Sequence, residues 1–156
     1  MKLIELTASL SPQLSAQISA FEALFDYPLS ENSRFSIDHG PDFTAFFAAI
    51  GDAKTWVLLS GDSVVAAISS AIKTVHIDGQ NNRVAYIGNL KVHPRFQSRF
   101  PKAPGPEKMQ AWPLEGRINS TSAGTITQLI RSHLLHDSDW AYCVVMNGTQ
   151  ITPEAY

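Results

Sequence analysis

The stretch that decides the fold is GNLKVHPRFQ, residues 88–97. It continues a run of strand-forming residues, 83–93, and two features disturb that run. Gly88 and Asn89 interrupt the strand pattern as residues at a β-bulge do, and such a bulge leaves backbone N–H and C=O groups for a ligand. Pro94 ends the strand because it has no N–H group to donate. The sequence therefore predicts a strand with a bulge in it, followed by a loop.

Two further strands precede this one and predict an antiparallel meander. Residues 55–59 are rich in strand-forming side chains, and the tight turn at 60–62 joins them to a second, long strand over 63–77. Turn-forming residues at 78–82 then lead into the strand at 83–93.

The N-terminal part of the chain predicts a strand followed by a helix. Residues 2–7 form a short, largely apolar segment, which predicts the strand. Ser11 is a good N-cap for the helix, and Pro12 suits the first helical position. Apolar residues then recur at spacings of four, three and four, which marks one face of a helix. These residues are Leu14, Ile18, Phe21 and Phe25. We expect the helix to end near Asp26, because Tyr27 precedes a proline.

A polar loop and a second helix are predicted next. The loop covers residues 30–40, and its charged or titratable side chains are Glu31, Arg34, Asp38 and His39. Residues 41–50 predict a helix with apolar residues on its inner face, and Gly51 is expected to end it in a left-handed conformation. Its aromatic residues, which we expect in the core or in a pocket wall, are Phe43, Phe46 and Phe47.

The C-terminal part predicts a loop, a helix and a strand. Prolines and glycines dominate residues 100–120, which predicts a long loop of a kind that is usually functional or mobile. A helix is expected from a cap at 120–122 to about His136, and a last strand over 140–146. His133 and His136 lie three apart on that helix, but only Asp137 and Asp139 are near as further ligands, so we expect no metal.

Composition excludes several classes of protein. With 44% hydrophobic and 17% charged residues, the 156-residue chain is typical of one globular domain, assigned to residues 1–156. A formal net charge of -2 offers no basic surface, so we expect no nucleic-acid partner. No apolar stretch reaches the roughly 18 residues that span a bilayer, so no membrane partner is expected. The single cysteine, Cys143, sits in an apolar run as a small hydrophobe, which favours a reducing, cytoplasmic compartment.

The order of elements and the run at 88–97 together resemble the GNAT superfamily of acyl-CoA-dependent N-acyltransferases. The signature of that family is V-x-P-x-x-Q/R-x-x-G-x-G/A, and Val92, Pro94 and Gln97 match it in type and spacing. Phe100 departs from it, because the first glycine of the signature belongs there. The resemblance implies an α/β (α+β) fold with a mixed, mainly antiparallel sheet flanked by helices, in the order β-α-α-β-β-β-α-β. Family members continue with a helix and two strands, so the chain is expected to be a fragment, a shortened member or a half that dimerises.

The resemblance also implies a function, which is transfer of an acetyl group from acetyl-CoA to a primary amine by direct attack. The acceptor is expected to be a small-molecule or peptide amine, and the protein a candidate homodimer. The residues that the resemblance places on the cofactor are Leu90, Val92, Gln97, Ser98, Arg99, Gly124 and Thr125. A backbone N–H near Leu90 would polarise the thioester carbonyl. Tyr156, near the end of the chain, would give a proton to the leaving thiolate.

The base that deprotonates the amine is left open by the sequence. Many family members place a carboxylate on the strand where this chain has Asn89, and an amide cannot act as a base. A water held by Asn89 or Tyr86, or an acid in the first loop, Glu31 or Asp38, would then take the proton. The alternative is a catalytically degenerate GNAT-like module that binds CoA or a protein partner without transferring anything.

Overall fold

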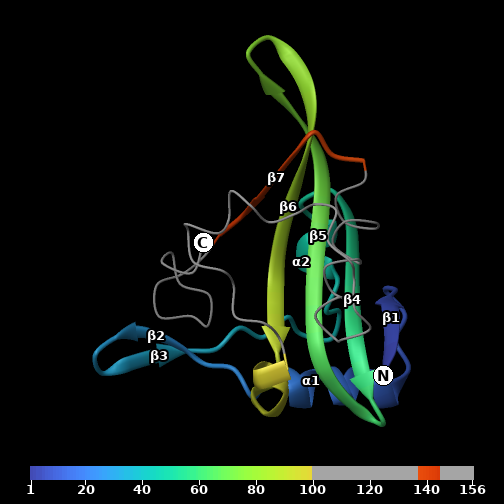
Figure 1. Cartoon of the computed structure of the whole chain (residues 1–156), viewed down its shortest axis with the longest axis vertical. Coiled ribbons are helices and arrows are strands. Elements are labelled where there is room, and N and C mark those ends of the chain that lie inside the picture. Colours follow the sequence, from blue (N-terminus) through green and yellow to red (C-terminus); the bar gives the residue numbers. More distant parts are fainter. Residues whose placement is uncertain (100–136, 145–156) are drawn as a thin grey trace.

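The computed structural model describes residues 1–99 and 137–144, and its main element is a five-stranded sheet (Figure 1). The strand order is β1-β4-β5-β6-β7, and every neighbouring pair is antiparallel except β6 and β7, which are parallel. The strands are β1 (Lys2–Leu6), β4 (Asp52–Ser60), β5 (Ser63–Ile77), β6 (Gln80–Val92) and β7 (Trp140–Cys143). The predicted mixed, mainly antiparallel sheet is confirmed.

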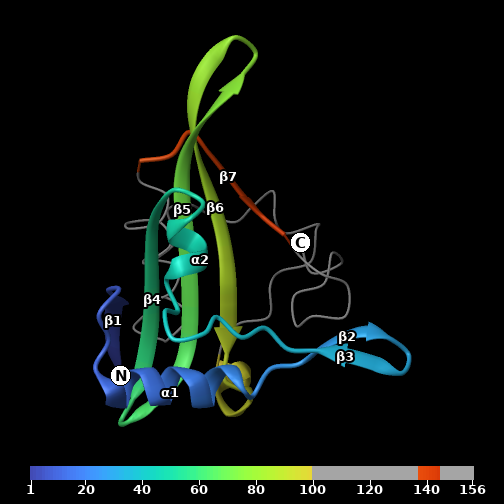
Figure 2. The same ribbon diagram turned by 180° about the vertical axis from the view of Figure 1, so that it is seen from behind.

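The two α-helices of the described residues cover one face of this sheet (Figure 2). They are α1 (Pro12–Glu22) and the short α2 (Ala45–Ala48). A separate hairpin of β2 (Tyr27–Ser30) and β3 (Ser33–Phe35) projects away from the sheet, and a 3-10 helix, η1 (Pro94–Arg99), follows β6. We call the side of the sheet that packs against α1 and α2 the helix face.

The helix α1 forms as the sequence predicts, and it closes the main core. The Ser11 hydroxyl accepts a hydrogen bond from the Leu14 N–H at 3.2 Å, and Pro12 is the first helical residue. Its apolar stripe packs on the helix face in a cluster of buried residues. They are Leu6, Ile18, Phe21, Phe25, Phe43, Val57, Val64 and Ala67. The helix ends at Glu22 rather than near Asp26. The N–H groups of Leu24 and Phe25 donate to the carbonyl three residues back, which is a 3-10 pattern and not that of an α-helix.

The meander of β4, β5 and β6 is confirmed, with tight turns that demand positive φ angles. Gly61 has φ 60° between β4 and β5, and Asp78 and Gly79 have φ 50° and 80° between β5 and β6. Two consecutive positive φ angles are those of a type I′ turn, whose twist suits a hairpin. Because the turn needs only two residues, β6 begins at Gln80, earlier than the sequence predicted.

The polar segment 30–40 is not the simple loop that the sequence predicted. Its first part pairs back on Tyr27–Ser30 to make the hairpin of β2 and β3. An ion pair between Arg34 and Asp26 ties the base of this hairpin, with one further hydrogen bond between the same side chains at 2.9 Å. The rings of Tyr27 and Phe35 contact each other across the strands at a tilt of 34°, with centroids 5.3 Å apart. Cross-strand pairs of this kind stabilise a short hairpin that lacks an alternating apolar pattern.

The second helix is shorter than predicted, and Gly51 serves a different purpose. The α-helix covers only Ala45–Ala48 within the expected 41–50. Gly51 does not adopt a positive φ, so the predicted left-handed stop is wrong. A Cβ atom on Gly51 would lie 2.4 Å from the backbone oxygen of Ile72, so this glycine lets the chain pass close to β5. Phe43 and Phe47 are buried as expected, whereas Phe46 is 55% exposed.

The last strand is confirmed in the part of the chain that can be seen. The predicted strand at 140–146 corresponds to β7, which ends at Cys143. Asp139 anchors its start, because the Arg83 N–H donates to an Asp139 carboxylate oxygen at 2.7 Å. Cys143, which the sequence places in an apolar run, is exposed. The predicted loop at 100–120 and helix at 120–136 lie outside the described residues.

Candidate functional site

The predicted bulge is present in β6. Ala67 of β5 pairs with Lys91 and Ser69 pairs with Gly88, so Asn89 and Leu90 together oppose Ile68. Asn89 has φ 54°, a left-handed conformation that asparagine tolerates better than most residues. The extra residue breaks the regular alternation of the strand.

Gly88 is required for packing rather than for its backbone angle. Its φ is not positive, and a Cβ atom there would lie 2.9 Å from Phe47 Cζ and 3.1 Å from the Tyr86 hydroxyl. Phe47 stacks on Tyr86 with ring centroids 5.6 Å apart and an interplanar angle of 11°. The missing side chain therefore lets α2 lie close to β6 immediately before the bulge. Gly88 and Lys91, which are three positions apart, share the helix face because of the bulge.

β7 leaves one edge of β6 unpaired from the bulge onward. The parallel ladder with β7 runs from Val84 to Ile87 and stops, and Val144, which follows β7, lies outside any strand. Over residues 88–92, no strand pairs with this edge among the residues the structure describes. The Asn89 side-chain Nδ2 is buried and has no hydrogen-bond partner among residues 1–99 and 137–144. Buried donors are rarely left unpaired, so a donor here suits a ligand with a carbonyl oxygen.

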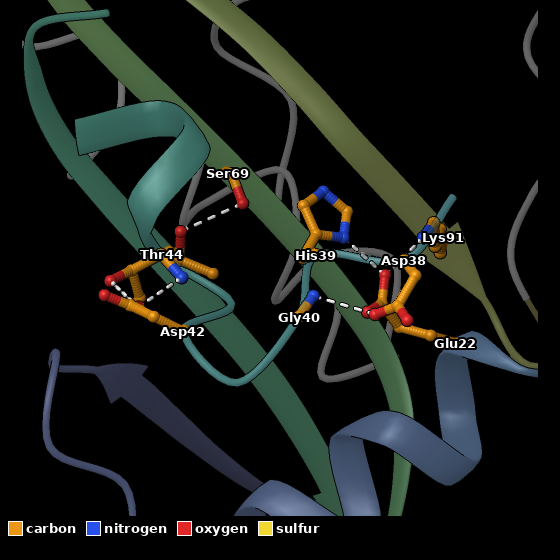
Figure 3. A network of polar contacts seen from close by, with 9 residues as sticks. Glu22, Asp38, His39, Gly40, Asp42, Thr44, Ser69 and Lys91 are labelled. Atoms are coloured by element: carbon orange, nitrogen blue, oxygen red, sulfur yellow. Dashed lines mark hydrogen bonds and ion pairs between the residues drawn. The ribbon is translucent and has the colours of Figure 1, made fainter. Parts of the chain in front are cut away.

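A buried polar network lies beside the bulge on the helix face, and sequence reasoning missed it (Figure 3). The Lys91 ammonium donates to Glu22 Oε1 at 2.9 Å, and His39 Nδ1 lies 2.6 Å from the same oxygen. The side chains of Lys91, Glu22 and His39 are 4%, 8% and 9% exposed. The Lys91 ammonium also lies 5.7 Å from the centre of the Phe25 ring. The network links β6, α1 and the segment before α2.

Charge and hydrogen bonding keep Glu22 ionised in this environment. Burial alone would raise its pKa, but hydrogen bonds from His39 and Lys91 and the charge of Lys91 outweigh burial and lower the pKa below its ordinary value of 4.5. A carboxylate only accepts hydrogen bonds, so Nδ1 of His39 must carry the proton that it shares with Glu22. In the neutral tautomer with the proton on Nδ1, the lone pair lies on the other nitrogen, Nε2.

Acidification tests this network. Because the folded-state pKa of Glu22 is lowered, its contribution to stability is complete above the unfolded-state value and is lost as pH falls through the folded-state value. We expect the free energy of unfolding of the wild type to fall more steeply than that of Glu22→Gln between about pH 5 and pH 3. Urea unfolding across this range measures both, and parallel curves would contradict the assignment. Asp26 and Asp42, whose pKa values are also lowered, titrate equally in both proteins.

The structure brings some of the predicted site residues together and leaves others undescribed. Asn89, Leu90 and Val92 all lie near the end of β6. Leu90 is 38% exposed, and Val92 packs against the cluster of Leu58, Val65 and Ala66. The backbone of Gln97, Ser98 and Arg99 belongs to η1. Gly124, Thr125 and Tyr156 lie outside the described residues.

The other candidate bases of the sequence are exposed, or stay protonated at neutral pH. Glu31 is exposed in the turn between β2 and β3. Asp38 is also exposed and accepts a hydrogen bond from the Gly40 N–H at 2.7 Å. Burial, with Tyr142 and Cys143 nearby, raises the pKa of Tyr86, so its hydroxyl stays protonated at neutral pH. Within the described ranges, no group of three or more potential metal ligands gathers, and no helix is long and apolar enough to cross a membrane.

Comparison with known proteins gives likeness of fold. No family model matches the chain, and no curated protein matches it. A predicted acetyltransferase from Clostridium acetobutylicum, solved with acetyl-CoA, matches with a TM-score of 0.51 at 12% identity, covering 99% of this chain and 85% of that one. A transcriptional regulator from Bacillus halodurans matches with a TM-score of 0.51 at 10% identity, over 94% and 82%. A mutant protein from the same organism gives 0.52 at 15% identity, over 94% and 83%.

These matches, together with the strand order and the bulge in β6, define a divergent GNAT-type fold. The fold that the resemblance implies is thereby confirmed. Identities of 10 to 15% carry no substrate from one protein to another, because folds host many functions.

Proposed function

We propose that this protein is an N-acetyltransferase that moves an acetyl group from acetyl-CoA to a primary amine. The observation that carries the proposal is the bulge at Asn89 and Leu90, on a strand edge that β7 leaves unpaired. Pantetheine carries amide groups that can pair with such an edge as a further strand would. A protein of similar fold has been solved with acetyl-CoA, which supports this choice of donor.

The chain's own residues suit the binding of a thioester arm. The buried Nδ2 of Asn89, which has no partner in the described part of the chain, can donate to a carbonyl oxygen of pantetheine. The backbone N–H of Leu90 is proposed to polarise the thioester carbonyl, where negative charge develops during attack. Gln97, Ser98 and Arg99 on η1, with Gly124 and Thr125, remain the proposed contacts of the pyrophosphate, and Tyr156 the proposed proton donor to the thiolate.

Acetyl-CoA is expected to stabilise the folded protein. A ligand that binds only the native state adds about 2.7 kcal/mol at 100 times its Kd. For a chain of this size that raises the thermal midpoint by about 5 to 10 °C. Thermal melts with and without millimolar acetyl-CoA measure the shift. Desulfo-CoA, which lacks the sulfur atom, shows how much of the shift depends on the thioester. An unchanged midpoint would contradict the proposed site.

Transfer itself needs a second assay, because the degenerate-module alternative predicts binding without chemistry. Release of CoA thiol from acetyl-CoA is followed with a panel of small and peptide primary amines. Amine-dependent release supports the transferase. Stabilisation by acetyl-CoA with no amine-dependent release would favour the module that only binds.

A further inference from the structure

His39 is held beside the bulge of β6 by two chains of contacts. On one side Glu22 joins His39 to Lys91, the residue that follows the bulge. On the other side the His39 ring packs edge-on against Phe46, with centroids 6.5 Å apart, and Phe46 packs against Phe47 at 5.3 Å. Phe47 in turn packs at Gly88, the residue that precedes the bulge. Both series of contacts end on β6, one on each side of Asn89 and Leu90. His39 therefore lies on the helix face, next to this part of the strand.

The ring of His39 is oriented for proton transfer. Nδ1 is directed at Glu22, and Figure 3 shows Nε2 pointing away from that carboxylate. Nε2 makes no hydrogen bond within residues 1–99 and 137–144. Phe43, whose centroid lies 4.8 Å from that of His39, supports the ring from a second direction. An imidazole fixed through Nδ1 by a carboxylate, with its other nitrogen available, has the arrangement of a general base.

We propose that His39 is the catalytic base that accepts the proton of the acceptor amine, with Glu22 and Lys91 as positioning residues. This inference rests on the proposed transferase function. The proposal supplies a base for deprotonation of the amine, because β6 (Gln80–Val92) includes no carboxylate that could act as one. Glu22 fixes the tautomer of His39, and Lys91 holds the Glu22 carboxylate ionised and in place.

The proton balance of the step is simple. The ammonium form of the acceptor gives one proton to His39 Nε2 and becomes the neutral amine. Its lone pair attacks the thioester carbonyl carbon, a C–N bond forms, and the C–S bond breaks with its electron pair on sulfur. The nitrogen loses a second proton, the thiolate gains one to become the CoA thiol, and His39 returns its proton to solvent. The net products are an acetylamide, CoA and one proton.

His39→Asn is the variant that separates catalysis from structure. The asparagine Nδ2 can replace the histidine Nδ1 as donor to Glu22, but nothing replaces Nε2. With the amine that the wild type acetylates fastest, we expect kcat/KM to fall by about 100-fold or more, as for loss of a general base. The acetyl-CoA-induced thermal shift is expected to stay within a few degrees of the wild-type value. His76→Asn, on an exposed histidine near the turn between β5 and β6, serves as the matched control with unchanged kcat/KM.

The pH profile of kcat/KM is the second readout. The titratable groups that the structure places around His39 are Glu22 from α1, Lys91 from β6, Asp38 next to it in the chain, and Tyr27 near Glu22. We expect the acid limb of the wild-type profile, where a general base stops working, to be lost in His39→Asn. Activity of His39→Asn within threefold of wild type, or an unchanged acid limb, would overturn the assignment. Absence of transfer by the wild type with every amine would overturn the proposed function itself.

Discussion

Lys91→Met is expected to destabilise the protein by about 3 to 5 kcal/mol, measured as the free energy of unfolding in urea at pH 7. Lys91 is buried, and its ammonium is an ion-pair partner of Glu22. Methionine fills a similar volume without a charge, so the substitution leaves the Glu22 carboxylate buried with His39 alone as its partner. The penalty comes from that uncompensated charge rather than from lost packing.

A double variant separates these two causes. Lys91→Met combined with Glu22→Gln removes both charges and keeps an oxygen that can accept from His39, so it should recover more than half of the lost stability. Lys2→Met, at an exposed lysine of β1, is the control and should change stability by less than about 0.5 kcal/mol. If Lys91→Met cost less than about 1 kcal/mol, the network would not be a buried ion pair.

Deleting Asn89 is expected to weaken acetyl-CoA binding while the protein still folds. Gly88 pairs with Ser69 and Lys91 pairs with Ala67, so removal of one residue leaves Leu90 alone opposite Ile68 and restores a regular ladder. Lys91 then stays on the helix face and keeps its ion pair. Two hydrogen bonds lost to the cofactor, at about 1 kcal/mol each, correspond to about 30-fold in Kd.

The matched control for this deletion is Asn89→Gly. Glycine adopts the φ of 54° without strain, so the bulge remains and only the side-chain amide is lost. Isothermal titration with acetyl-CoA should show a smaller loss for Asn89→Gly than for the deletion. Equal binding by the deletion variant and the wild type would show that the bulge is irrelevant to the cofactor.

The features that the sequence predicts well are local ones. The Ser11 cap, the stripe from Leu14 to Phe25 and the tight turns at Gly61 and Gly79 depend on neighbours a few positions away. The bulge could be predicted because glycine and asparagine stand together inside a strand. The hairpin of β2 and β3 could not, because its strands are too short to show an alternating pattern.

The network of Glu22, His39 and Lys91 could not be predicted because its members lie far apart in the chain. Glu22 and Lys91 are separated by 69 positions, and only the fold brings them together. One signal was available, since Glu22 falls four positions after Ile18, within the apolar stripe of α1. A charged residue in such a stripe needs a buried partner, but α1 alone does not say which residue supplies it.

Hydrogen exchange of β6 with and without acetyl-CoA tests the central claim most directly. If the open edge beside the bulge binds the cofactor, amide exchange over residues 88–92 should slow on adding acetyl-CoA, and this protection should be lost when Asn89 is deleted. Exchange at 77–81, in the turn between β5 and β6, should stay unchanged. If saturating acetyl-CoA leaves residues 88–92 of the folded wild type unprotected, that result contradicts the account.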